Sequence, residues 1–292
     1  FSIHRKGDTP QGLFCANGQC SHCTLVIDGL AQKSCVTPLK DGMQIKPLRH
    51  IPEIPADNRP LTHYKKIELT CDILVIGGGP AGLMAALELA QLNYNVIVVD
   101  DKEKLGGKLL LQTHKFFGSI EDCYAGRRGI EIAALLEKEL SSHTNIKIFT
   151  DTTVAAIYKD KKAGLFIKNQ NYAIVAFRGL IISPGAHEKS LIFNGNHLPG
   201  VFGAGAFQTL VNRDLVQASR RIFIVGSGNV GLIAAYHALQ AGITVVGICD
   251  ILGKVSGYKV HADKIKRMGV PIYLKHTVIA AEGNGKVARV TI

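Results

Sequence analysis

The sequence predicts an α/β fold built from two parallel-sheet units, with a small cysteine-rich β segment in front of them. Three observations support this fold class. Short apolar runs are followed by glycine turns twice, at 77–82 and at 226–231, about 150 residues apart. Each turn leads into a stretch with helical periodicity and then into a second apolar run, the order of a strand, turn, helix and strand. Four of the seven cysteines lie within the first 35 residues.

The composition agrees with this fold. Hydrophobic residues make up 47% of the 292 residues, with 31 glycines and no tryptophan, which suits an α/β protein dense in tight turns. No apolar run reaches the roughly 18 residues of a membrane span. No signal-peptide pattern opens the chain, so we expect a cytoplasmic protein. The first residue is Phe1, so we expect the start to be clipped.

The chain is basic, with a formal net charge of +11. Such a balance can indicate contact with nucleic acid or membranes. The basic residues are scattered in short pairs, such as Lys65-Lys66 and Arg220-Arg221, without interleaved aromatic residues. We therefore expect no nucleic-acid partner and attribute the excess to anionic dinucleotides and an acidic partner subunit.

The cysteine segment has the spacing of an iron–sulfur loop. Cys15, Cys20 and Cys23 follow the pattern C-x4-C-x2-C, and Cys35 comes after eleven further residues. Three thiolates on a tight loop and a fourth from a later strand can hold a [2Fe–2S] cluster. This is the plant-type ferredoxin spacing, with the fourth cysteine nearer than usual. The loop is short and small-residued, so its backbone can point N–H groups at the sulfurs.

Two other interpretations of this segment stay open. A structural zinc site usually takes two CxxC pairs, and only one is present. A thioredoxin-like dithiol would use Cys20 and Cys23 alone and would leave Cys15 and Cys35 unexplained. His22 lies inside the loop, where we expect an exposed residue and not a ligand, since four thiolates complete the set.

The first glycine turn predicts a dinucleotide site. Gly77 permits the tight turn, Gly79 lets the backbone approach a pyrophosphate, and Gly82 lets the helix pack closely on the strand. The free amides at the start of the helix, which Pro80 and Ala81 begin, would hold the diphosphate.

An acid and further small residues extend this candidate site. Asp100 lies 23 positions after Gly77, at the tip of the second strand, where a carboxylate can accept hydrogen bonds from ribose hydroxyls. The backbone is expected to approach the cofactor closely in the residues after Asp100 and again after the strand at 180–182. The remaining candidate residues are Asp101, Gly106, Gly107, Lys108, Gly185 and Ala186.

The second glycine turn, with Gly226, Gly228 and Gly231, repeats the first. The same count of 23 positions lands on Cys249, with Asp250 one residue later. The expected carboxylate is thus displaced or absent. NAD(P) is a candidate cofactor here, but a domain that has lost its nucleotide stays an open alternative.

Further elements are expected between and after these units. Strands are expected at 24–29, 32–36, 72–76, 95–99, 146–149, 153–158, 164–168, 172–176, 180–182, 222–225, 244–248, 271–274, 278–281 and 287–292. Helices are expected at 83–92, 130–140, 204–210, 232–240 and 262–267.

The expected domains are a [2Fe–2S] segment at 1–48, a linker at 49–70, an FAD-binding domain at 71–215 and a second dinucleotide domain at 216–292. Prolines recur in the linker, which favours an extended connection. A second dinucleotide domain should continue beyond Ile292, so we expect a fragment.

Together these motifs predict a Rossmann-like flavoprotein that binds two dinucleotides, with a partial β-grasp, ferredoxin-like segment at its N-terminus. The chain resembles the α subunit of heteromeric sarcosine oxidase and its relatives among amino-acid, proline and opine dehydrogenases and hydrogen cyanide synthase. The likeness is carried by Gly12-Leu13-Phe14-Cys15 through Cys23, Val26-Ile27-Asp28-Gly29, Ser34-Cys35, Asp41-Gly42-Met43, Asp72 to Gly82, Leu105-Gly106-Gly107, Pro184-Gly185-Ala186, Leu198-Pro199-Gly200-Val201 and Val225 to Gly231.

The resemblance implies an electron-transfer subunit with FAD and a [2Fe–2S] cluster. A partner subunit with its own flavin would oxidise the C–N bond of a small amine or amino acid. The chain departs from the family in lacking a hairpin before Cys15 and a C-terminal flavin-closing segment. It also departs in having Ser183-Pro184 in place of an ATG-like turn and Cys249 at the acid position.

Two alternatives are kept. The chain could be self-contained, with NAD(P)H reducing FAD and FAD reducing the cluster and an external acceptor. It could also be a non-enzymatic assembly scaffold with empty nucleotide sites. No side-chain acid, base or nucleophile stands out as catalytic, and the flavin domain has no CxxC disulfide of the kind that disulfide reductases use.

Overall fold

The computed structural model describes residues 12–50, 67–116, 118–168 and 171–292, together with residues 52, 53, 56 and 58. The chain divides into two compact units. Unit 1 comprises Phe1–Asn58 and His187–Ile292, and unit 2 comprises Arg59–Ala186. Unit 1 therefore contains both the cysteine segment and the second glycine turn. The four-part division expected from the sequence stays a prediction.

Unit 2 is built on a six-stranded sheet in the order β6-β5-β4-β9-β8-β7. Its strands are β4 (Ile67–Ile76), β5 (Val96–Val99), β6 (Ile146–Phe149), β7 (Thr152–Tyr158), β8 (Lys162–Ile167) and β9 (Asn171–Ile182). β4 pairs in parallel with β5 and β9, and β5 pairs in parallel with β6. β8 is antiparallel to both β7 and β9. The parallel part is the arrangement that strand–turn–helix–strand units require.

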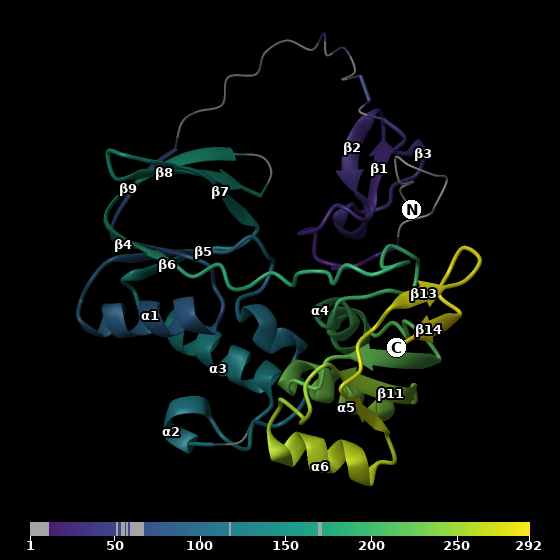
Figure 1. Ribbon diagram of the computed structural model, residues 1–292. Helices are drawn as coiled ribbons and strands as arrows, with labels where there is room; N and C mark the ends of the chain where they lie inside the picture. Colours follow the sequence, from purple (N-terminus) through teal and green to yellow (C-terminus); the bar gives the residue numbers. More distant parts are fainter. Residues whose placement is uncertain are drawn as a thin grey trace. The chain divides into compact units, whose positions relative to one another are not determined.

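Helices α1 (Pro80–Gln91) and α3 (Gly129–Ser142) cover one face of the parallel strands (Figure 1). Leu83 and Leu87 of α1 pack there against Val75 and Val98. A fully buried leucine contributes about 1.5–3 kcal/mol, so tertiary packing outweighs intrinsic propensity in stabilising this helix. The shorter elements of unit 2 are a 3₁₀ helix (Gly107–Leu111) and α2 (Ile120–Cys123).

The described residues of unit 1 form three small sheets. The cysteine segment forms an antiparallel sheet in the order β2-β1-β3, and the second glycine turn belongs to a parallel sheet in the order β10-β11-β12. The strands are β1 (Thr24–Ile27), β2 (Leu30–Lys33), β3 (Ile45–Pro47), β10 (Arg221–Val225), β11 (Thr244–Asp250), β12 (Ile272–Leu274), β13 (Ala280–Glu282) and β14 (Arg289–Thr291). The helices are a 3₁₀ turn (Ser34–Val36), α4 (Ala204–Gln208), a π-helical turn (Thr209–Arg213), α5 (Asn229–Gln240) and α6 (Lys259–Arg267).

Two backbone hydrogen bonds connect the cysteine loop to the rest of unit 1. Gly12 N–H donates to the carbonyl of His197 (2.8 Å), and Gly203 N–H donates to the carbonyl of Phe14 (2.9 Å). A Cβ on Gly12 would lie 2.7 Å from the Cα of Pro199, which leaves room for glycine alone. The residue before Cys15 is thus held by the segment that precedes α4.

Several element boundaries differ from those expected. The strands expected at 172–176 and 180–182 form one strand, β9, because β4 pairs with it from Ala173 to Ile182. β4 begins at Ile67, inside the expected linker. The strand expected at 32–36 ends at Lys33, where a 3₁₀ turn begins. α1 starts at Pro80, three residues early, since proline is well suited to the first helical position.

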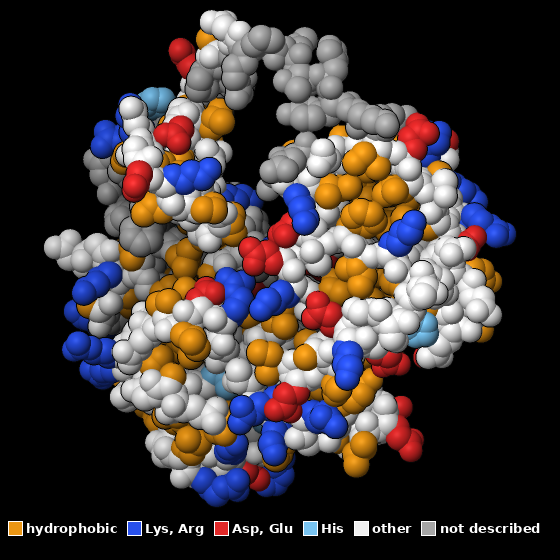
Figure 2. Space-filling view, turned by 180° about the vertical axis from the view of Figure 1, so that it is seen from behind, with side chains coloured by type: hydrophobic (Ala, Val, Ile, Leu, Met, Phe, Trp, Pro, Cys, Tyr) orange, Lys and Arg blue, Asp and Glu red, His pale blue; other side chains and the backbone are white. Residues whose placement is uncertain are grey.

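Among the described residues, no helix has both the length and the apolar character that crossing a membrane demands. Figure 2 shows Lys and Arg side chains in separate groups on one face, interspersed with acidic and apolar side chains. The positive charge on this face is therefore divided among several places.

Candidate functional site

The first glycine turn joins β4 to α1, and two of its glycines are required sterically. Gly77 has φ +104°, and a Cβ there would lie 2.2 Å from the carbonyl oxygen of Ser183. A Cβ on Gly82 would lie 1.9 Å from the carbonyl oxygen of Gly77. Both distances are far below van der Waals contact, so these positions have the roles predicted from the sequence.

Gly79 is different, because no protein atom lies within 4 Å of the position that its Cβ would occupy. Gly79 is also the N-cap of α1, and no side chain accepts a hydrogen bond from the helix start. Open space before unpaired helix amides is what a diphosphate needs. The turn therefore fits the diphosphate of an FAD molecule.

Asp100 fixes this turn. Its Oδ2 accepts a hydrogen bond from Gly78 N–H (2.6 Å), and its Oδ1 accepts one from Lys102 N–H (2.9 Å). Burial raises the pKa of Asp100, and neighbouring Asp101 raises it further, although the two amides act in the opposite direction. A carboxylate offers about four lone-pair positions, so Asp100 keeps capacity for ribose hydroxyls.

The other candidate residues near this turn are placed as follows. Gly106 has φ +109° and donates its N–H to the carbonyl of Gly78 (2.7 Å). A Cβ on Gly107 would lie 3.0 Å from the Cα of Gly79, so the backbone does approach the turn closely there. Asp101, Lys108, Pro80, Ala81, Gly185 and Ala186 are exposed. Their contacts with a cofactor stay predictions.

Ser183 holds the turn from the other side and was not predicted to do so. Its hydroxyl donates to the carbonyls of Ile76 (2.9 Å) and Gly77 (3.1 Å). The sequence shows Ser183 only as a departure from a small-residue turn. Its role depends on the pairing of β9 with β4, which no local pattern reveals.

The second glycine turn, between β10 and α5, repeats the geometry of the first. Gly226 also has φ +104°, and a Cβ on Gly231 would lie 2.1 Å from the carbonyl oxygen of Gly226. The nearest atom to a Cβ on Gly228 would be Ser256 Oγ at 3.8 Å. Space for a diphosphate is thus present at this turn too.

Of the two outcomes expected for this acid, displaced or absent, the structure shows the first: Asp250, and not Cys249, takes the acid position. Asp250 Oδ2 accepts from Ser227 N–H (2.8 Å), as Asp100 accepts from Gly78. β11 contains one extra residue, since Ile222 pairs with Val245 but Phe223 pairs with Gly247. This irregularity in the ladder moves the acid by one position, so counting along the chain misplaces it.

The cysteine loop brings the four predicted thiols together in two pairs. The Cys15 thiol lies near enough to that of Cys20, and the Cys23 thiol near enough to that of Cys35, to raise the pKa of its neighbour. Cys35 is near enough because β1 and β2 form a hairpin in which Thr24 pairs with Lys33. An eleven-residue gap therefore returns the chain to Cys23, which explains the short spacing.

Hydrogen bonds from Ser34 hold Cys35 next to Cys23. Ser34 donates both its N–H (3.1 Å) and its hydroxyl (2.9 Å) to the carbonyl of Cys23. No group of three or more His, Cys, Asp or Glu within the described ranges is arranged to hold one metal ion. Two pairs of thiols suit two irons with two thiolates each better than a single tetrahedral zinc.

The loop backbone supports thiolate formation at Cys15. Burial alone would raise the pKa of the Cys15 thiol, but hydrogen bonds from the amides of Asn17, Cys20 and Gln19 lower it overall. The Cys20 amide lies 3.3 Å from Cys15 Sγ. Burial, and then the neighbouring Cys23 thiol, raise the pKa of Cys35 to about 12. The amides point at sulfur as the loop composition predicts.

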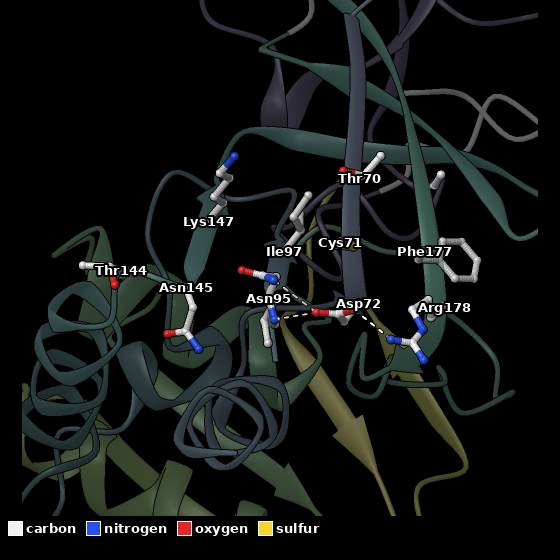
Figure 3. A pocket seen from close by; sticks show the side chains of 12 residues that line it. Thr70, Cys71, Asp72, Asn95, Ile97, Thr144, Asn145, Lys147, Phe177 and Arg178 are labelled. Carbon is white, nitrogen blue, oxygen red and sulfur yellow. Dashed lines mark hydrogen bonds and ion pairs between the residues drawn. The ribbon is translucent and has the colours of Figure 1, made fainter. Parts of the chain in front are cut away.

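Unit 2 also contains a cavity of about 570 Å³ away from the glycine turn (Figure 3). Asp72 lies on it and accepts from Asn95 N–H (2.9 Å), Asn95 Nδ2 (3.2 Å) and Arg178 (3.4 Å). Burial raises the pKa of the adjacent Cys71 thiol to about 11. Nucleotides bind at the carboxyl ends of parallel strands, and this cavity lies at the amino ends of β5 and β6, so we assign no cofactor to it.

Two glycine turns with matching acids, the second of them in the unit that also contains the four loop cysteines, define a redox protein with two nucleotide-binding folds and an iron–sulfur segment. Residues 71–292 match the pyridine nucleotide-disulphide oxidoreductase family, and the chain belongs to that family. Residues 3–50 match the 2Fe-2S iron-sulfur cluster binding domain. FAD and a 2Fe–2S cluster are therefore its cofactors, and NAD(P) is a cofactor found in such a fold.

Named relatives agree with the resemblance seen in the motifs. The chain is 33% identical over 201 residues to the sarcosine oxidase subunit alpha of Rhizobium meliloti, covering 64% of this chain and 20% of the relative. It is 27% identical over 186 residues to the hydrogen cyanide synthase subunit HcnB of Pseudomonas protegens, covering 63% and 39%. The predicted family resemblance is confirmed, although the chain spans only about a fifth to two fifths of these relatives.

Solved structures confirm the fold. L-proline dehydrogenase from P. horikoshii matches 99% of this chain and 50% of its own chain, with a TM-score of 0.71 and 21% identity. Thioredoxin reductase from T. acidophilum matches 76% of this chain and 69% of its own, with a TM-score of 0.59 and 22% identity. The predicted α/β architecture is confirmed.

Substituting Cys35 with serine is expected to remove most of the cluster. The pairing with Cys23 would lose a thiolate ligand, which should lower cluster affinity by about tenfold or more. Iron content and the electron paramagnetic resonance (EPR) signal of the reduced protein measure this. Cys123→Ser, outside the loop, is the control and should keep the full signal. A Cys35→Ser protein with normal iron and an unchanged signal would contradict the assignment.

Gly79→Ala is expected to impair FAD binding without unfolding the protein. The added methyl meets no protein atom within 4 Å, but it enters the space that fits the diphosphate. Bound flavin per chain should fall about tenfold, while the free energy of unfolding should change by less than about 1 kcal/mol. Flavin absorbance and thermal unfolding measure the two effects. Gly253→Ala, on an exposed loop, is the control. Normal flavin content in Gly79→Ala would exclude this diphosphate position.

Asp250→Asn is expected to lower the free energy of unfolding by about 2 kcal/mol at pH 7, because buried amides and hydroxyls lose a charged acceptor. Burial acts to raise the pKa of Asp250, but hydrogen bonds from Ser227, Leu252 and Ser256 lower it overall. A lowered folded-state pKa gives stability above the unfolded value of about 3.9. The stabilisation that the Asp250 carboxylate contributes is lost as the pH falls through its folded-state pKa.

Denaturant unfolding at pH 7 and near pH 3 tests this expectation. The difference between the native chain and Asp250→Asn should narrow in acid. Asp263→Asn, which removes an exposed ion pair with Lys259, is the control and should change stability little at either pH. An equal difference at both pH values would show that the charge of Asp250 is not what stabilises the turn.

Proposed function

We propose that the chain is the electron-transfer flavoprotein and iron–sulfur subunit of a heteromeric, FAD-dependent amine or amino-acid dehydrogenase or oxidase. When bound, FAD would accept the electrons, and the cluster would pass them on one at a time. The residues of the chain would hold these groups. The turn Gly77–Gly82 would carry the flavin's diphosphate, and Cys15, Cys20, Cys23 and Cys35 would carry the two irons.

The paired thiols of the cysteine loop are the observation that carries this proposal. In the described part of unit 2, neither Cys71 nor Cys123 forms a disulfide, and neither lies in a CxxC motif. A flavin in this unit would therefore have no dithiol acceptor of the kind that disulfide reductases use. The iron–sulfur loop is the redox group available to it within the chain.

The names of the relatives support a proposal for the partner and the substrate class. The named matches are subunits of sarcosine oxidase, opine oxidase and hydrogen cyanide synthase. We propose that a flavin-containing partner subunit oxidises a small amine or amino acid and passes electrons to this chain. None of the seven cysteines, all within the described residues, forms a disulfide, which suits the reducing cytoplasm that we propose as the location.

A second candidate function is a self-contained NAD(P)H:acceptor oxidoreductase. It is favoured by the open space above Gly228 and the open amides at the start of α5, which has no side-chain cap. In that case electrons would enter at the second glycine turn and not from a partner subunit.

Reduction of the purified protein by different donors separates the two functions. The complex is purified anaerobically through a tag on this chain, alongside the chain alone. Both should show flavin absorption near about 370 and 450 nm. L-proline, sarcosine or an opine should bleach the flavin and produce the cluster signal in the complex only. Bleaching of the chain alone by NADH or NADPH would favour the second function, and a colourless chain would exclude both.

A further inference from the structure

The two nucleotide turns have the same hydrogen-bonded skeleton. Four backbone bonds recur at equivalent positions with lengths that differ by at most a few tenths of an ångström. At the first turn they are Gly77 N–Val99 O (2.8 Å), Gly106 N–Gly78 O (2.7 Å), Asp151 N–Lys102 O (3.0 Å) and Thr152 N–Asp100 O (2.9 Å). At the second they are Gly226 N–Cys249 O (2.7 Å), Gly257 N–Ser227 O (2.9 Å), Lys275 N–Leu252 O (3.0 Å) and His276 N–Asp250 O (3.0 Å). Any side chain that differs between them is therefore a candidate for ligand selectivity.

The two acids, Asp100 and Asp250, differ in the number of hydrogen bonds that they accept from the protein. Asp100 accepts from two backbone amides, as described above. Asp250 accepts the two equivalent amides and, in addition, the hydroxyls of Ser227 (2.5 Å) and Ser256 (3.2 Å). Asp250 is only 7% exposed. The two serine hydroxyls add to the Ser227 amide on Oδ2, whereas Oδ1 accepts from Leu252 N–H alone. Asp250 therefore has less acceptor capacity left for ribose hydroxyls than Asp100 has.

The charge beside the acids also differs. Asp151 and Lys275 occupy equivalent positions after the third strand, both with positive φ (+48° and +58°). A Cβ on Gly253 would lie 3.4 Å from Lys275 Cε, so the Lys275 side chain extends beside the loop that follows Asp250. The region 100–108 with Asp151 has four acidic and three basic residues, whereas 250–259 with Lys275 has one acidic and three basic.

Two of these lysines are available to an anion. Lys254 and Lys275 are exposed, and neither has an ion pair within the described parts of the chain. Lys259, in contrast, pairs with Asp263. In dinucleotide sites of this type, a free acid at the strand tip binds an unmodified ribose, and a nearby cation accommodates a 2′-phosphate. Asp250 is already engaged, and the free charges here are cations.

We propose that the second nucleotide site binds a dinucleotide with a 2′-phosphate, NADP(H), in preference to NAD(H), and that Lys275 is the residue that selects it. The inference rests on the proposed role of Gly226–Gly231 as a nucleotide turn. It concerns binding alone, so it can fail while the proposed electron-transfer function stands.

Calorimetric titration of the full chain with NADP⁺, NAD⁺ and 2′,5′-ADP tests the proposal. NADP⁺ should bind at least about tenfold more tightly than NAD⁺, and 2′,5′-ADP should compete with it. The preference should weaken with added salt, because Lys275 is exposed. Equal or tighter binding of NAD⁺ would overturn the proposal, and so would the absence of binding by either dinucleotide.

Lys275→Asn is the decisive variant, since asparagine tolerates positive φ and removes the charge. It should reduce the preference for NADP⁺ about tenfold and leave NAD⁺ binding unchanged. Lys161→Asn is the matched control, because Lys161 is an exposed lysine with φ +57° in unit 2. A preference that survives Lys275→Asn would overturn the assignment of Lys275.

A double variant tests the role of Asp250. Ser227→Gly with Ser256→Ala removes both hydroxyls, and the first change copies Gly78 of the first turn. Freed acceptors on Asp250 should raise NAD⁺ affinity about tenfold. Thermal unfolding checks that the variant is folded. Unchanged NAD⁺ affinity in a folded double variant would show that the serines do not compete with the ribose.

Discussion

A hydrogen bond between a turn amide and a carboxylate is the interaction on which both nucleotide turns depend. Gly78 donates to Asp100 and Ser227 donates to Asp250, at 2.6 and 2.8 Å. A hydrogen bond to a charged group contributes about 1.5–3 kcal/mol, comparable to the burial of one leucine. This hydrogen bond also orients the turn, because it fixes the turn against the end of the neighbouring strand. The first amides of the helix then point into the space expected for the diphosphate. Parallel pairing of the strands is what delivers the acid to that point.

The duplicated skeleton explains how one chain can present two turns with different chemistry. The bonds that recur are between backbone groups, so they do not constrain the side chains around them. Gly78 can become Ser227 and Asp151 can become Lys275 without loss of the turn. Glycine recurs at Gly77 and Gly226, where φ is positive, and at Gly82 and Gly231, where a Cβ would strike the neighbouring backbone. It also recurs at Gly79 and Gly228, where the space in front of the helix amides stays open. The choice of nucleotide can therefore change through the side chains around the turn, while the backbone hydrogen bonds of the turn stay the same.

Features encoded locally were predictable from the sequence, and features set by register were not. The glycine positions and the order of strands and helices follow from local periodicity and steric need. The predicted four-cysteine spacing was sufficient to identify a thiol cluster, because the hairpin that closes it is itself local. The count of 23 positions ended at Cys249, one residue before Asp250, because the extra residue in β11 is visible only in its pairing with β10. Ser183 was missed for the same reason, since its partners Ile76 and Gly77 are more than 100 residues away.

The positive charge is distributed unevenly between the parts of the chain. In the sequence the basic residues form short scattered pairs, yet residues 187–292 contain twelve Lys or Arg and only five Asp or Glu. Most of the formal charge of +11 therefore belongs to this part of unit 1, which carries the second glycine turn. Six of the twelve lie between Lys254 and Lys275, in the loop after Asp250, in α6 and at the end of β12. These residues belong to the unit that contains the second glycine turn, so the excess of positive charge lies in the unit whose candidate ligand is an anionic dinucleotide.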